Sequence, residues 1–163
     1  MNAQAAVVDA GEAEGRERPR REFLTCRLGE ESYGIDILRV QEIRQIDRVT
    51  RVPHVASFTR GVINLRGAIV PIVDLGLMFG FAQPIALEQA SAIILTAGQR
   101  LVGLVVSGVS DVIALADEDI RPAPDLGARA VSEALSGIGI VEGASVLLLD
   151  VDHLLRRIRE ERE

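Results

Sequence analysis

The residue best suited to recognising a partner is Arg66, at the tip of a predicted hairpin. Two apolar runs of strand length flank a short polar tip that contains Asn64, Arg66 and Gly67. The runs suit strands of a buried sheet and are too short for independent helices, and Gly67 can adopt a positive φ at little cost. A guanidinium there can form a bidentate ion pair or donate to a carbonyl. We therefore predict a recognition role, while an ion pair with an acid such as Glu42 that braces the fold remains the alternative.

The residue sets of common catalytic sites are missing from the sequence. All 18 basic residues are Arg, which excludes a Schiff-base lysine, a Walker A lysine and a Ser-x-x-Lys site. The acids Asp117 and Asp119 lie in a polar, Pro-rich segment and are expected to be solvated. His54 and His153 have no Cys or second His nearby in the sequence, so we predict no metal site. The sequence indicates a protein that is not an enzyme and needs no cofactor.

The hairpin that carries Arg66 has a second copy later in the chain. At a spacing of 76 residues the chain repeats two glycines, an alanine and a closing aspartate: Gly61 and Gly137, Gly67 and Gly143, Ala68 and Ala144, Asp74 and Asp150. The upstream segment 33–43 matches 102–112 at a spacing of 69. Two repeats of roughly 70 residues indicate two similar small lobes. The copies differ at their tips, where Glu142 and Ile140 replace Arg66 and Asn64, so the tips are candidates for function.

Many short strand-like segments with little helix predict an all-β fold of barrels or a sandwich. We expect a disordered N-terminal tail over 1–21, a first lobe over about 22–82, a second lobe over about 90–151 and a C-terminal helix over 152–163. Exchange of strands between the lobes is left open. Asp74 is predicted to cap a short helix, and residues 55–60 are predicted to form one helical turn.

Composition narrows the classes of function. The net charge of −6 argues against a protein that binds nucleic acid through phosphate contacts. No segment approaches the ~18 uninterrupted apolar residues of a membrane span, and the N-terminus does not resemble a signal peptide. We therefore predict a soluble, cytoplasmic protein without direct membrane insertion. The single cysteine, Cys26, lies in an apolar run and is expected to be buried and inert.

Several motifs resemble the CheW family of chemotaxis coupling proteins. The longest is GVINLRG (61–67) followed by IVPIVDL (69–75). The others are YGIDI (33–37) with VQEI (40–43), VGLVV (102–106) with GVSDV (108–112), and IRPAP (120–124). The resemblance runs from about residue 22 to 155, with the motifs in the right order. The chain departs from the pattern at Ser107, where the family often has Asp; this puts a contact of that acid in doubt, but not the fold.

The resemblance implies two five-stranded SH3-like barrels packed together. It also implies an adaptor that binds the regulatory domain of the histidine kinase CheA and the cytoplasmic tips of methyl-accepting chemotaxis receptors. Such a protein would be cytoplasmic and recruited to receptor arrays at the membrane. The alternative is a barrel protein of the same type that regulates a kinase in a non-flagellar pathway.

The resemblance also implies site residues. The receptor tip docks in an apolar groove between the lobes, and the positions that match this region are Val40, Glu42, Ile43, Arg66 and Val112. Apolar anchors with a few oriented charges suit a helix in a groove. The open alternatives are that the three apolar residues belong to the core and that Glu42 is a solvated strand charge. The signature positions expected to act in turns or structure are Gly61, Asn64, Gly67, Pro71 and Asp74. The resemblance assigns no kinase contacts to individual residues.

Overall fold

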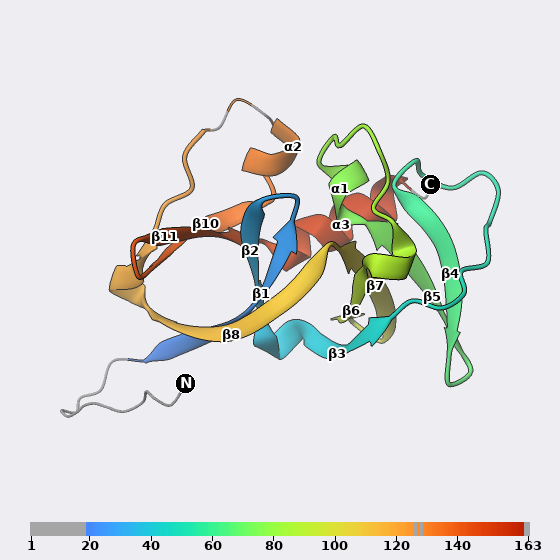
Figure 1. Ribbon diagram of the computed structural model, residues 1–163, viewed down its shortest axis with the longest axis horizontal. Coiled ribbons are helices and arrows are strands. Elements are labelled where there is room, and N and C mark those ends of the chain that lie inside the picture. Colours follow the sequence, from blue (N-terminus) through green and yellow to red (C-terminus); the bar gives the residue numbers. More distant parts are fainter. Residues whose placement is uncertain (1–18, 126, 128, 162–163) are drawn as a thin grey trace.

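The computed structural model describes residues 19–125, 127 and 129–161. The chain forms two curled β-sheets that lie side by side, with the C-terminal helix running across the middle (Figure 1). The prediction of an all-β fold with a short C-terminal helix is confirmed. The first strand begins at Arg20, so Arg20 and Arg21 belong to a strand rather than to the predicted tail. Pro19 lies outside any strand or helix, and residues 1–18 lie outside the described residues.

The first sheet has six strands in the order β8-β1-β2-β11-β10-β9. All its neighbouring strands are antiparallel except β2 and β11, which run parallel. In chain order its strands are β1 (Arg20–Leu28), β2 (Glu31–Asp36), β8 (Gly108–Ala116), β9 (Ile120–Arg121), β10 (Leu135–Val141) and β11 (Ala144–Leu149).

The second sheet has five strands in the order β3-β6-β7-β5-β4. Only β5 and β7 pair in parallel, which repeats the pattern of the first sheet. Its strands are β3 (Val40–Gln45), β4 (Thr59–Leu65), β5 (Ala68–Asp74), β6 (Ser91–Ala97) and β7 (Arg100–Val106). The strand pairing of neither sheet closes into a complete barrel, and the short β9 is a sixth strand where the resemblance implied five.

Three short α-helices and three 3₁₀ turns complete the described chain. The helices are α1 (Leu75–Met78), α2 (Arg129–Ser132) and α3 (Val151–Glu161), and the 3₁₀ turns are η2 (Ile37–Arg39), η3 (Leu87–Gln89) and η4 (Asp117–Asp119). The predicted helical turn over 55–60 is wrong, because β4 already begins at Thr59. The Asp150 carboxylate accepts a hydrogen bond from the backbone N–H of His153 at the start of α3. The predicted end of this helix at 162–163 lies outside the described residues.

Each sheet contains strands from both halves of the chain. The hairpin β1–β2 lies between β8 and β11, while the hairpin β6–β7 lies between β3 and β5. The chain passes between the sheets at two short crossings, η2 from β2 to β3 and Ser107 from β7 to β8. The lobes seen in space therefore do not coincide with the contiguous ranges 22–82 and 90–151.

The core is built almost entirely from aliphatic side chains. One small cluster lies with the five-stranded sheet, around Val70, Ile72 and Ile94, and another lies with the six-stranded sheet, around Phe23 and Leu148. The largest cluster joins strands of both sheets to the buried face of α3: Leu24, Cys26, Leu28, Tyr33, Ile35, Val73, Ile93, Leu95, Leu104, Val106, Leu149, Val151, Leu154 and Ile158 are among its members. This shared core holds the two sheets together.

No helix among the described residues is long and apolar enough to cross a membrane.

Burial controls the reactivity of Cys26. Its side chain is fully buried in the shared core, and desolvation raises the pKa of the thiol to about 12. Since the thiolate is the reactive form, we expect no reaction of the native protein with a disulfide reagent at pH 8. When the chain is unfolded in guanidinium, its thiol should react with an aromatic disulfide reagent and release one equivalent of the coloured aromatic thiolate. Rapid modification of the native protein would contradict this burial.

Candidate functional site

The tip of the hairpin β4–β5 holds Arg66 in a defined orientation. Leu65 pairs with Ala68, so Arg66 and Gly67 form a two-residue turn with φ angles of 52° and 92°. Positive φ at both positions is typical of a type I′ turn, whose twist matches that of the flanking strands. The Asn64 side-chain oxygen accepts a hydrogen bond of 2.9 Å from the Gly67 backbone N–H. The Arg66 side chain is 65% exposed, as a recognition residue must be.

Arg66 also joins the two edges of the five-stranded sheet. Its guanidinium donates to the carboxylate of Glu42 on β3. The strands β3 and β4 are the two edges of this sheet, so the ion pair crosses the open seam of a curled sheet. The hydrogen bond from Arg66 lowers the pKa of Glu42, partial burial opposes this, and the charges of Arg66 and Arg44 add to the lowering. The contact is consistent with the alternative that Arg66 only braces the fold. The guanidinium is nevertheless exposed and remains accessible to a partner.

Gly61 lies where the segment around Thr50 forms an isolated β-bridge with the edge strand β4. Thr50 and Val62 exchange two backbone hydrogen bonds of 2.8 and 2.9 Å. A Cβ atom at Gly61 would lie 2.2 Å from the Thr50 carbonyl oxygen, and the φ of Gly61 is 139°. Only glycine allows this backbone approach without strain. The chain after β3 thereby reaches β4 and narrows the gap between the sheet edges.

The apolar residues of the predicted receptor site come from both sheets. Val40 and Ile43 lie on β3; Val40 packs against the shared core, and Ile43 is 46% exposed. Val112 lies on β8 in the six-stranded sheet, opposite Leu24, and is 50% exposed. Both strands lie along the lower side of the molecule in Figure 1. The structure therefore brings Glu42 and Arg66 into contact, and places Val112 on the neighbouring sheet.

Leu38 is an exposed apolar residue that the sequence prediction missed. It lies on η2, the crossing from β2 to β3, and is 85% exposed. A depression of about 410 Å³ beside it is lined by Arg20, Arg21, Glu22, Asp36, Ile37, Leu38 and Ala114. Its place between the matching motifs YGIDI and VQEI puts Leu38 in the predicted region, but does not indicate that its side chain is exposed. Its exposure extends the apolar surface from β3 toward β8.

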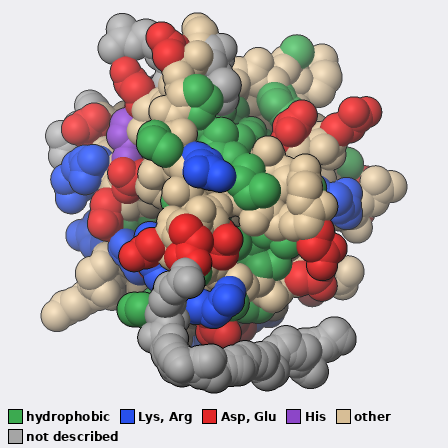
Figure 2. Space-filling model, turned by 90° about the vertical axis from the view of Figure 1, so that its left-hand side faces the viewer, with side chains coloured by type: hydrophobic (Ala, Val, Ile, Leu, Met, Phe, Trp, Pro, Cys, Tyr) green, Lys and Arg blue, Asp and Glu red, His purple; other side chains and the backbone are tan. Residues whose placement is uncertain are grey.

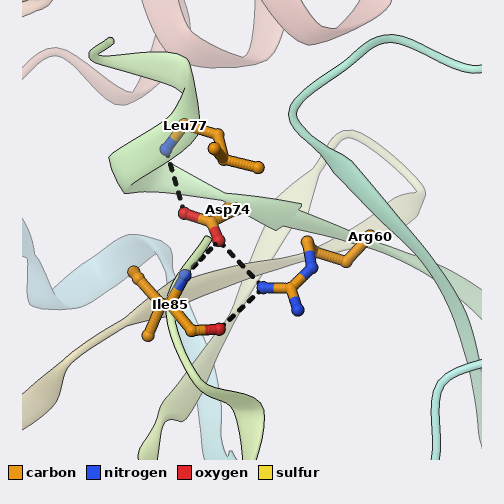
Figure 3. A network of polar contacts seen from close by, with 4 residues as sticks. All are labelled: Arg60, Asp74, Leu77 and Ile85. Atoms are coloured by element: carbon orange, nitrogen blue, oxygen red, sulfur yellow. Dashed lines mark hydrogen bonds and ion pairs between the residues drawn. The ribbon is translucent and has the colours of Figure 1, made fainter. Parts of the chain in front are cut away.

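Asp74 anchors the base of the hairpin (Figure 3). Its carboxylate is fully buried and accepts hydrogen bonds from the backbone N–H of Leu77 (3.0 Å) and of Ile85 (2.9 Å). The first of these caps α1. The guanidinium of Arg60 donates to the same carboxylate at 2.9 Å and to the carbonyl oxygen of Ile85 at 2.8 Å. The residue Pro71, also of the signature, lies within β5 opposite Val62.

The matching hairpin β10–β11 has the same turn with the opposite charge. Glu142 and Gly143 adopt φ angles of 51° and 84°, close to those of Arg66 and Gly67. Asp111 occupies the repeat position of Glu42, so the equivalent pair is Asp111 with Glu142 and is entirely acidic. Figure 2 faces the end of the molecule that Figure 1 shows on the left, and there acidic side chains, with basic ones among them, surround a central hydrophobic area that itself carries a basic side chain. The Arg–Glu pair of the five-stranded sheet therefore has no counterpart at the equivalent positions of the other sheet.

The described side chains form no metal centre. Among the described residues, no group of three or more His, Cys, Asp and Glu side chains is placed to hold an ion. His153 instead lines a shallow depression with Glu133, Arg156, Arg157 and Glu160.

Comparisons with known proteins agree on one family. The model of the CheW-like domain family matches residues 22–159. A chemotaxis protein CheW of Klebsiella aerogenes is 47% identical over 90% of this chain and 85% of its own. A chemotaxis protein CheW of Rhizobium meliloti is 34% identical over 88% of this chain and 91% of its own.

A solved structure supports the same relationship. The crystal structure of the scaffolding protein TtCheW from Thermoanaerobacter tengcongensis matches with a TM-score of 0.71 at 28% identity. The match covers 81% of this chain and 90% of that protein. The resemblance noted in the sequence is thus confirmed by the family model, by close relatives and by the fold: this chain belongs to the CheW-like domain family.

Proposed function

We propose that this chain is a non-catalytic adaptor that couples the histidine kinase CheA to the cytoplasmic tips of chemotaxis receptors. The observation that carries the proposal is the match of nearly the whole described chain to the CheW-like domain family, at 47% identity to a protein named for chemotaxis. In this role the protein works in the cytoplasm and is recruited to receptor arrays. The kinase supplies the chemistry, and the adaptor supplies two binding surfaces.

The receptor surface in this proposal runs over the crossing η2 and the strands β3 and β8. Exposed apolar side chains of Leu38, Ile43 and Val112 would contact the apolar stripe of a receptor helix. Arg66 and Glu42 stand at one side of this surface as an oriented charge pair. A helix with apolar anchors and a carboxylate at its edge fits such a surface, because Arg favours bidentate contacts with carboxylates.

Charge reversal at Arg66 tests the receptor surface. We expect Arg66→Glu to weaken receptor-dependent kinase activation roughly tenfold or more, because it removes an Arg contact and places a negative charge against a carboxylate of the receptor helix. The midpoint of thermal unfolding should change little, because the Arg66 side chain is 65% exposed and an ion pair of an exposed side chain contributes little to stability. The backbone accepts a Glu here, since Glu142 has the same conformation in the matching turn. Thermal unfolding and kinase autophosphorylation would be measured on the same protein.

The double variant Arg66→Glu with Glu42→Arg is the matched control. It restores an ion pair across the seam with the charges exchanged. If Arg66 contacts the receptor, coupling stays low in the double variant. Recovery of coupling would show instead that Arg66 only braces the sheet.

The function itself is tested by kinase autophosphorylation in a mixture of receptor membranes and cognate kinase, with and without this protein. Strong receptor-dependent activation supports the adaptor. Kinase binding without a receptor response would favour a regulator of a kinase in a different pathway. Failure to bind either partner would contradict the proposal.

A further inference from the structure

Each sheet is completed by a hairpin from the other half of the chain. The first half, 20–82, places β3, β4 and β5 in the five-stranded sheet but leaves a gap between β3 and β5. The hairpin β6–β7 of the second half fills this gap. In the same way the second half, 83–161, leaves a gap between β8 and β11 that the hairpin β1–β2 fills. Neither half contains all the strands of a sheet.

The two exchanges are geometrically equivalent. Ile72 of β5 pairs in parallel with Gly103 of β7, and Leu148 of β11 pairs with Gly34 of β2. These residues are related by the repeat spacings of 76 and 69 found in the sequence. A Cβ at Gly103 would lie 2.6 Å from Cδ1 of Ile72, and one at Gly34 would lie 2.8 Å from Cδ2 of Leu148. Each half thus carries a hairpin with a glycine, and a strand whose aliphatic side chain occupies the space beside the glycine of the other half.

We propose that the two halves, 20–82 and 83–161, are binding partners for each other, and that they form a stable 1:1 complex when the connection between them is cut. Each half presents a gap in a sheet, and the ligand of each gap is a β-hairpin of the repeated sequence. The chain is then a fused pair of units with reciprocally exchanged hairpins.

The contacts between the halves are extensive. Four strand pairings cross from one half to the other: β1 with β8, β2 with β11, β3 with β6, and β5 with β7. The shared core also mixes the halves, since Leu24 and Tyr33 from the first pack in one cluster with Ile93 and Leu154 from the second. Burial of apolar surface and completion of backbone hydrogen bonds both favour the assembled state.

The connection is open to cutting. Its residues Gly80, Ala82, Gln83 and Pro84 are exposed. A cut after Ala82 leaves Ile85 with the second half. The hydrogen bond that Arg60 donates to the Ile85 carbonyl oxygen, and the one that the Ile85 backbone N–H donates to Asp74, then become contacts between the halves. These bonds then help to hold the cut chain together.

The test uses the full chain with a specific protease site inserted between Ala82 and Gln83. After cleavage we expect one species of the intact mass in size-exclusion chromatography and an unchanged circular dichroism spectrum. The urea midpoint of the cut protein should rise with protein concentration in a single transition, because two chains must associate to fold. The uncut variant is the matched control, and its midpoint should not depend on concentration.

Two outcomes would overturn the proposal. Halves that separate and each keep their strand signal would show that each folds alone. Halves that separate and unfold at micromolar concentration would show that their contacts are too weak. As a second variant, Gly103→Val crowds the pairing of β5 with β7 between the halves. The cut Gly103→Val protein should dissociate at concentrations where the cut natural sequence stays assembled, while the uncut Gly103→Val protein reports whether the variant folds.

Discussion

Replacing Arg60 by Met is expected to lower the free energy of unfolding by about 3–5 kcal/mol, because it leaves a buried carboxylate without its counter-ion. Asp74 has no exposed surface, and Arg60 is its ion-pair partner at 2.9 Å. The two backbone N–H groups that also bind the carboxylate remain in the variant, but they carry no net charge. Urea unfolding followed by circular dichroism measures the loss.

The double variant Arg60→Met with Asp74→Asn separates charge from shape. The asparagine oxygen can still cap α1, and no buried charge is left unpaired. We therefore expect the double variant to be more stable than Arg60→Met alone, a coupling that a double-mutant cycle detects. A loss below about 1 kcal/mol for Arg60→Met would mean that the pair behaves like an ordinary surface ion pair.

Gly61→Ala is expected to be the most damaging single methyl addition in the signature hairpin. The new Cβ would lie 2.2 Å from the Thr50 carbonyl oxygen, which is backbone and cannot rotate away. The φ of 139° adds a conformational cost of about 1–3 kcal/mol for a residue with a side chain. We expect a total loss of about 3 kcal/mol or more, together with faster hydrogen exchange at the amides of Thr50 and Val62.

Gly143→Ala is the matched control for that variant. Gly143 also has a positive φ, of 84°, but a Cβ there would meet no atom within 4 Å. This variant therefore has the conformational cost without the collision, and should lose only about 1 kcal/mol. Equal losses in the two variants would show that the approach of Thr50 to the hairpin contributes nothing.

Local features of the fold could be predicted from the sequence, because they depend on neighbouring residues. The hairpin predicted around Arg66 and Gly67 has its two-residue turn at these two positions. The predicted cap of α1 by Asp74 depends only on an acceptor placed before the helix, and the structure has that hydrogen bond. Periodicity and turn residues are short-range signals and carry this information.

Long-range features could not be predicted in the same way. The sequence left strand exchange open, since nothing in β1–β2 states which strands it joins. Arg60 was missed because its partner Asp74 lies 14 positions away on the next strand. Leu38 was missed as an exposed residue because an apolar residue between two strands is equally compatible with the core. The repeat was visible in the sequence, but its consequence for topology appears only in the structure, where Gly34 pairs with Leu148 and Gly103 pairs with Ile72.

The two short crossings between the sheets have a mechanical consequence. Two units joined by a single connection can rotate about it. These two sheets are joined by two connections, η2 and Ser107, which restricts that rotation. The movement that two connections still allow is a hinge opening about the axis through both of them. The shared core opposes this opening, because it would expose the apolar side chains that both sheets contribute. We therefore expect the two sheets to move together as one rigid body, so that a displacement of one sheet by a partner also displaces the other.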